Sequence, residues 1–129
     1  MNLKMKFVGA TLTLSSFFAG AQSVDFEKER RDNPVAGSAL ACIAIGTAIN
    51  VDLGKSHPQY DLIRGMLHTA TKTMFSVIDS SDPLHEKMIP AVMQTLSDLQ
   101  RDKIKNDSAY QKRKSQYFQA LGNCIKAYP

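Results

Sequence analysis

The chain has 129 residues, a length that allows one small domain with one core. Its 16 basic and 12 acidic residues give a formal net charge of +4, or +2 for residues 22–129, which hold 14 of the basic residues and all 12 acidic ones. So mild a charge gives no reason to expect nucleic acid or a membrane surface as a partner.

The first 21 residues are predicted to be a secretory signal peptide. Lys4 and Lys6 form a basic start, residues 7–18 are mostly apolar, and Ala19-Gly20-Ala21 fits the small residues that precede a signal-peptidase cut. The apolar run is too short to span a bilayer comfortably, and a retained membrane anchor is the alternative. Cleavage after Ala21 leaves residues 22–129 as a single exported domain.

A charge-free stretch early in this domain predicts a central helix. No side chain between Val35 and Val51 is charged, and most are small or apolar. Asn33 suits the N-cap, and Pro34 suits the first helical position because that turn needs no N–H donor. Gly54 is expected to end the helix in a left-handed conformation. A helix that is apolar on nearly every side belongs inside the fold.

Apolar side chains recur at steps of three and four along the rest of the chain, which predicts further helices. Their expected ranges are 22–32, 58–78, 83–102 and 107–128. Pro90 interrupts the third of these, so a kink or two short helices are expected there. No run of alternating residues is long enough for a strand. The predicted fold is therefore all-α, a small bundle of five to six helices.

Polar residues next to prolines mark the expected helix boundaries. Ser56 or His57 is expected to cap the helix that begins at Pro58. The segment 79–83 forms the next boundary, and Asp107 is expected to cap the last helix.

The two cysteines of the chain, Cys42 and Cys124, both lie in the exported part. In an oxidising compartment they are the only intramolecular pair available, so one disulfide is expected to join the central helix to the last one. Closing a loop of this size stabilises a fold by about 4–5 kcal/mol in the chain-entropy model. Two free buried thiols are the alternative.

Catalytic and metal-binding patterns are weak in this sequence. His57, His68 and His85 lie in separate segments, and no HExxH, CxxC or His-x-His spacing is present. Asp61, Arg64 and His68 share one helical face, which is the pattern of an acid–histidine pair for base catalysis. A solvated polar face with weak ion pairs explains them better. We expect no enzyme activity, no metal and no cofactor.

Methionine and histidine together in a helical bundle also raise the alternative of a haem carrier. The segment 86–129 contains no histidine, although that architecture needs one near the end opposite its methionine ligand. Methionine as flexible core filler is the favoured interpretation of the four methionines in the exported part, which are Met66, Met74, Met88 and Met93.

A basic cluster lies near the last helix boundary, with acidic residues mixed into it. It forms either a solvated surface or a patch that guides the approach of an acidic partner. Its basic members are Arg101, Lys103, Lys105, Lys112, Arg113 and Lys114, and the acidic ones are Asp98, Asp102 and Asp107.

The two cysteine segments carry a family resemblance. Ala39-Leu40-Ala41-Cys42-Ile43-Ala44 resembles the first cysteine helix of the type VI secretion amidase immunity proteins. Asn123-Cys124-Ile125-Lys126-Ala127-Tyr128 resembles their final motif, a Cys-Ile pair followed by an aromatic residue. The cysteine spacing, the signal peptide and the all-α pattern also agree with that family.

This resemblance implies a non-enzymatic periplasmic protein that acts as a homodimer. It implies that the protein binds a cell-wall amidase delivered by neighbouring bacteria and blocks the Cys–His site of that enzyme with a protruding loop. Two turns are candidates for the loop, by their position between helices. The first comprises Lys105, Asn106, Asp107 and Ser108, and the second runs from Leu53 to His57 and includes Lys55.

Two other classes of function remain open from the sequence. A small periplasmic acid-stress chaperone, or another helical binding protein, also fits a helical domain with one disulfide. An enzyme or a haem carrier is the third class.

Overall fold

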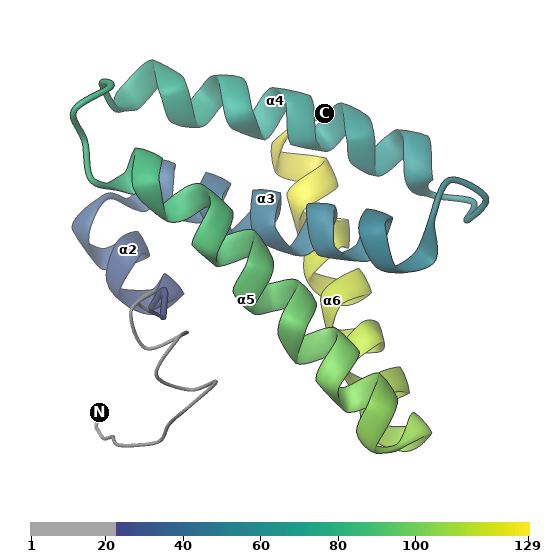
Figure 1. The fold of residues 1–129 in the computed structure, drawn as a ribbon. Coiled ribbons are helices and arrows are strands. Elements are labelled where there is room, and N and C mark those ends of the chain that lie inside the picture. The colour runs from purple at the N-terminus through teal and green to yellow at the C-terminus, as the bar shows by residue number, and fades with distance from the viewer. Residues whose placement is uncertain (1–22) are drawn as a thin grey trace, which may run out of the picture.

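The computed structural model describes residues 23–129, and these residues form helices and connecting turns with no strand (Figure 1). The all-α prediction is confirmed, and the predicted signal peptide lies outside the described residues. The helices are α2 (Phe26–Asp32), α3 (Pro34–Leu53), α4 (Tyr60–Val77), α5 (Leu84–Lys105) and α6 (Asp107–Ala127).

The predicted boundaries of the central helix α3 are confirmed. The Asn33 side chain accepts a hydrogen bond from the Ala36 N–H at 3.2 Å, and Pro34 occupies the first helical position. Gly54 follows the helix with a φ of 80°, a conformation that side-chain-bearing residues rarely adopt. Local capping chemistry therefore accounts for both ends of this helix.

Helix α3 is the core of the bundle, and every other helix in the described part of the chain packs against it (Figure 1). Of its 20 residues, 12 are buried. By length and composition alone it could cross a bilayer. Contact with four neighbouring helices explains its apolar composition equally well, because most of its surface is covered by other helices.

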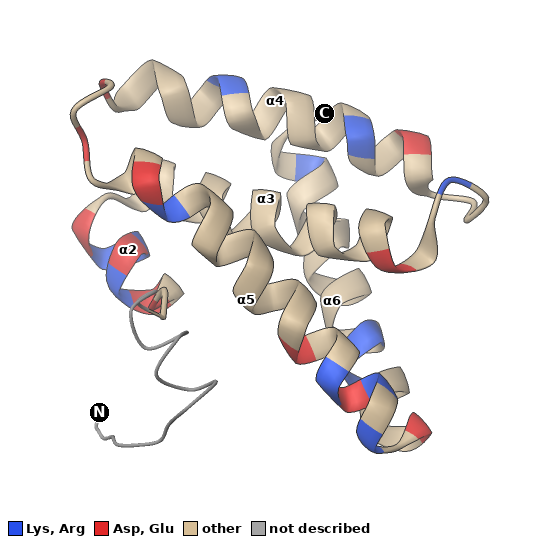
Figure 2. Ribbon diagram, in the orientation of Figure 1, with Lys and Arg blue, Asp and Glu red and all other residues tan. Residues whose placement is uncertain are grey.

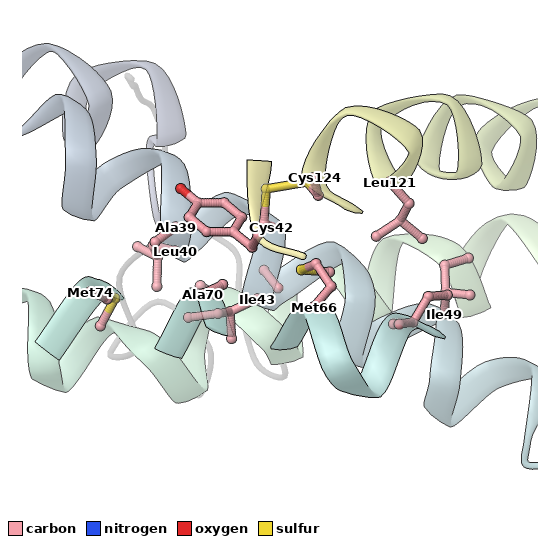
Figure 3. Close-up of a cluster of buried hydrophobic side chains, with 14 of the residues drawn as sticks. Ala39, Leu40, Cys42, Ile43, Ile49, Met66, Ala70, Met74, Leu121 and Cys124 are labelled. Atoms are coloured by element: carbon pink, nitrogen blue, oxygen red, sulfur yellow. A yellow bond between two sulfur atoms is a disulfide. The ribbon is translucent and has the colours of Figure 1, made fainter. Parts of the chain in front are cut away.

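A disulfide joins Cys42 of α3 to Cys124 of α6, with their Cα atoms 5.7 Å apart (Figure 3). The predicted pairing is confirmed, and the alternative of two free thiols is wrong. The bond lies within the core, whose fully buried large side chains come from four helices. They are Leu40, Ile49, Ile63, Met66, Met74, Leu99 and Leu121.

Several predicted helix bounds differ from the structure. Helix α2 begins at Phe26 rather than at 22, and α5 runs from Leu84 to Lys105 rather than over 83–102. The start of α4 and the cap of α6 also differ. Helix α4 begins at Tyr60, after a turn in which the Tyr60 N–H donates to the His57 carbonyl at 3.1 Å. This turn contains Pro58, which we expected to begin the helix. Helix α6 is capped by Asn106, whose side chain accepts a hydrogen bond from the Ala109 N–H at 2.7 Å. The expected cap, Asp107, is the first residue of the helix. Asn106 and Asp107 are adjacent and both residue types favour the N-cap, so the sequence did not show which of them caps the helix.

Helix α5 continues through Pro90, so of the two expected alternatives, a kink or a pair of short helices, the pair is wrong. Proline removes one N–H from the helical ladder and crowds the preceding turn. Leu84 on one side of Pro90, and Ala91 and Leu99 on the other, are all buried against the core. Packing on both sides of the proline holds the helix in one piece.

Candidate partner-binding surface

The structure brings both predicted loops to the same end of α3. Asp52, near the end of this helix, accepts a hydrogen bond from the Tyr110 hydroxyl of α6 at 2.5 Å. The Lys103 ammonium of α5 lies 3.5 Å from the same carboxylate. The base of the α5–α6 hairpin is therefore held against the last turn of α3, although Asp52 and Tyr110 are 58 positions apart in the sequence.

The His57 side chain stabilises the α3–α4 turn through contacts within the protein. His57 Nδ1 accepts from the Gln59 N–H at 3.3 Å, so the other ring nitrogen carries the proton and donates to Asn50 Oδ1 at 2.8 Å. The His57 ring also meets Tyr60 and Phe118 edge-on, with centroids 5.8 and 6.3 Å away. The contacts of His57 therefore stabilise the turn, and its ring is not free to contact a partner.

The other predicted contact residues are exposed. Lys55 lies in the α3–α4 turn, and the remaining ones form the end of the α5–α6 hairpin. Only Asn106 lies outside the two helices there. Lys105 ends α5, while Asp107 and Ser108 begin α6. The expected protruding loop is therefore the tight end of a helical hairpin.

The hairpin end carries an apolar residue that the sequence reasoning missed. Ile104 is 87% exposed, more than any other large hydrophobic side chain in the described part of the chain. It is the only large apolar residue between Gln100 and Ser108. Its position within a charged stretch is the feature of the sequence that could have indicated its exposure. Its exposed apolar surface would be available to a partner that covers the end of the hairpin.

Charged and aromatic contacts hold the two helices of the hairpin together near its end. Arg113 of α6 donates to Asp102 of α5, and this hydrogen bond holds the pKa of Asp102 below its usual value. The Lys103 and Lys114 ammonium groups lie 5.2 and 5.0 Å from the centre of the Tyr110 ring. These contacts fix the positions of α5 and α6 relative to each other near the end of the hairpin.

The hairpin is also anchored to the core at Asp52. The Asp52 side chain is only 2% exposed, and it accepts the hydrogen bond of the Tyr110 hydroxyl. Burial, followed by this contact, raises the pKa of Tyr110 to about 12. The phenol therefore remains a donor to the carboxylate throughout the physiological pH range.

The hairpin is the basic end of the molecule (Figure 2). Residues 98–114 contain six basic and three acidic residues, a net charge of +3. Part of this charge is paired locally, as in the contact of Arg101 with Asp98 at 2.7 Å. Lys105 and Lys112 take part in no ion pair within residues 23–129. A positive field therefore surrounds Ile104, which favours an acidic partner surface.

The predicted catalytic pattern does not assemble. Asp61, Arg64 and His68 are all exposed on α4, and no ion pair joins them in the described structure. Met66 and Met74 are buried among apolar side chains. Residues 23–129 contain no group of three or more histidine, cysteine or acidic side chains placed to hold a metal ion.

Comparison of the chain with protein-family models, curated proteins and solved structures finds no match.

Proposed function

We propose that this chain is an exported helical protein that inhibits a secreted peptidoglycan amidase by inserting the end of the α5–α6 hairpin into its active site. The observation that carries the proposal is the hairpin end itself. Two long helices meet there at a single residue, Asn106, beside an Ile104 side chain that is 87% exposed. Such a projection fits a cleft rather than a flat surface.

A braced projection is well suited to inhibition. Hydrogen bonds from Tyr110 to Asp52 and from Arg113 to Asp102 already fix the hairpin. Little conformational entropy would therefore be lost when it docks. The positive charge around Ile104 would speed the approach to an acidic rim and select against basic ones.

The class of partner comes from the resemblance of the two cysteine segments to the type VI secretion amidase immunity proteins. Two features of the chain support the same setting. The Cys42–Cys124 disulfide needs an oxidising compartment such as the periplasm. The predicted signal peptide would deliver the chain there.

The test is inhibition of an amidase encoded by a neighbouring gene, measured as hydrolysis of purified peptidoglycan at increasing concentrations of the oxidised protein. We expect full inhibition by the wild type. Ile104→Asp should weaken it about tenfold or more, because the substitution places a carboxylate where an apolar contact is made. Leu62→Asp is the matched control, since Leu62 is 55% exposed on α4.

Three results would count against the proposal. Finding no amidase-like gene nearby and no partner in a periplasmic pull-down would remove the partner. Equal inhibition by wild type and Ile104→Asp would remove the hairpin end as the inhibitory element. A stronger loss with Leu62→Asp would move the contact to α4.

A small acid-stress chaperone is the second candidate, favoured by the exposed apolar side chains Ile89 and Met93 of α5. Such a protein should lose structure in strong acid, as its carboxylates protonate, and then bind an apolar dye. A circular dichroism titration that stays flat, with no dye binding, would eliminate this candidate.

A further inference from the structure

One side of α5 is exposed from its second turn to the end of the hairpin. Ile89, Met93, Ser97, Gln100 and Ile104 follow one another at steps of three or four residues, so they share one side of the helix. All five are exposed. We call these five residues the α5 flank, which is about 22 Å long at 1.5 Å per residue.

Other described segments contact α5 away from this flank. The Phe75 ring of α4 stacks on His85 in the first turn of α5, with ring centroids 4.7 Å apart, and the flank begins one turn later. The N-terminal segment contacts the side chains of Lys87 and Gln94. The side of α5 that is buried lies opposite the flank and includes Ala91, Thr95 and Leu99. The flank is therefore left open by the rest of residues 23–129.

The α5 flank is unusual for a side of a helix that faces water, because none of its five residues is charged. Ile89 is 75% exposed and Met93 is 55% exposed. No residue from Met88 to Ser97 is charged, as the tan central part of α5 in Figure 2 shows. A solvent-facing helix side ordinarily carries charged and polar residues. Covering this one would bury apolar surface without removing a charge from water.

The other helix of the hairpin presents a different surface. No large apolar side chain of α6 is exposed. The exposed residues of its first half that follow the hairpin end are Gln111, Lys112, Ser115, Gln116 and Gln119. The hairpin therefore has an apolar flank on α5 and a polar one on α6.

The hairpin end is too small to hold an enzyme by itself. Residues 104–108 are all exposed there, but a stable protein complex uses about 20–30 residues on each side. Two packed helices, each about 10 Å wide with axes about 10 Å apart, form a hairpin about 20 Å across. Only the end of such a hairpin would enter a cleft, so the rest of the contact has to come from a helix that lies against the rim.

We infer that the α5 flank is a second contact surface for the inhibited enzyme and lies against the rim of the cleft that the hairpin end enters. The inference rests on the function proposed above and adds which helix faces the enzyme. The flank is continuous with Ile104, and it offers the apolar surface that α6 lacks. The complementary rim is apolar opposite Ile89 and Met93, and acidic where it approaches Lys105.

The first test measures inhibition of peptidoglycan hydrolysis by variants of the flank. Met93→Asp should weaken inhibition about tenfold or more, because it places a carboxylate in the apolar centre of the flank. Met93 lies about 16 Å along α5 from Ile104, so the substitution leaves the hairpin end itself unchanged. Leu62→Asp is the matched control, since Leu62 of α4 is equally exposed at 55%, and it should have no effect. Circular dichroism reports whether both variants fold.

The second test asks which helix of the hairpin faces the enzyme. Ser97 of α5 and Ser115 of α6 are both exposed, and each lies nine positions from Asn106. Each serine is replaced in turn by cysteine and labelled with a bulky polyethylene glycol maleimide. Both native cysteines are in the disulfide, so the new thiol alone reacts. The label on Ser97→Cys should weaken inhibition about tenfold or more, while the label on Ser115→Cys should leave it unchanged. This comparison decides the question even if Met93→Asp fails to fold.

The outcomes separate this inference from the proposed function. If Ile104→Asp weakens inhibition while Met93→Asp and the Ser97→Cys label do not, the function stands and the inference is overturned. Equal losses from the two serine labels also overturn it, because the enzyme would then contact both helices. A change in the solution mass of the free protein on Met93→Asp would place a second copy, rather than the enzyme, on the flank. A wild type that inhibits no amidase removes both the function and the inference.

Discussion

The α2–α3 junction and the α5–α6 junction are built in the same way and serve opposite purposes. A single asparagine joins the two helices in each case. Asn33 accepts from the Ala36 N–H at 3.2 Å, and Asn106 accepts from the Ala109 N–H at 2.7 Å. Each asparagine also closes the helix before it with its own N–H. The local structure alone does not separate them.

The two junctions differ in the residue that lies four positions after the asparagine. After Asn33 it is Gly37, which is buried so closely against α2 that an added Cβ would lie 2.5 Å from the Glu29 carbonyl group. After Asn106 it is Tyr110, whose phenol reaches across to Asp52. At the α2–α3 junction, which we call the closed junction, the two helices are in tight contact. At the α5–α6 junction, which we call the open junction, Tyr110 is bonded to Asp52 while residues 105–108 are exposed. The same turn chemistry therefore supplies a core contact in one place and a projecting surface in the other.

The largest expected effect concerns the bond that ties the two junctions to one core. Cys42 lies in the helix that follows the first junction, and Cys124 in the helix that follows the second. Replacing both with alanine should lower the free energy of unfolding by about 4–5 kcal/mol, because the bond closes a long loop in the unfolded chain. Urea unfolding of the oxidised wild type and the double variant measures it. A loss below about 1 kcal/mol would show that helix packing alone holds the junctions in place.

Gly37→Ala tests the closed junction. The new methyl group would meet backbone atoms of Glu29 and Arg30, which cannot rotate away, so we expect a loss of about 3 kcal/mol or more in unfolding free energy. Gly65→Ala is the matched control, since a Cβ at that position of α4 would meet no atom within 4 Å apart from its chain neighbours and nearby helix backbone. The control should gain about 0.5–1 kcal/mol from its higher helix propensity. Equal effects of the two substitutions would mean that α2 does not press on α3.

The two asparagine caps test whether the junctions are equivalent locally. Asn33→Ala and Asn106→Ala each remove one hydrogen bond to the first turn of a helix, so each should cost about 1 kcal/mol in unfolding free energy. Chemical denaturation of the two variants side by side checks this. A large loss at Asn106 alone would show that the open junction contributes to the core after all.

The smallest effect appears only at high pH and only at the open junction. The pKa of Tyr110 is raised from its ordinary 10 to about 12, so the protonated phenol contributes stability that is complete below pH 10. That contribution is lost as the pH rises from 10 to about 12. The difference in unfolding free energy between wild type and Tyr110→Phe should therefore shrink over this interval. A constant difference would mean that Asp52 does not hold the phenol.

Much of the fold could be predicted from the sequence because its signals are local. Asn33, Pro34 and Gly54 act on backbone groups within four residues, so α3 was predicted with correct boundaries. The disulfide followed from there being only two cysteines, in segments that both read as helices. The start of α4 was missed because the His57 side chain turns back to Asn50, a contact with the preceding helix.

The turn at the candidate site could be predicted from the sequence, but its surroundings could not. Counting positions between helices placed the candidate loop at residues 105–108, where α5 meets α6, while the 87% exposed Ile104 next to it was overlooked. Periodicity assigns a residue to a helix face, but whether that face is covered depends on other helices. For the same reason, Ile89 and Met93 gave no signal of exposure in the sequence.

The sequence by itself determined the helical class, the ends of α3 and the cysteine pair, because capping, helical spacing and covalent bonding need only near neighbours or a unique mate. Only the tertiary structure decided which of two similar asparagine junctions is buried, that Asp52 anchors the hairpin through Tyr110, and that one side of α5 faces solvent. Burial depends on the summed contacts of segments far apart in the chain, and no local pattern contains that sum.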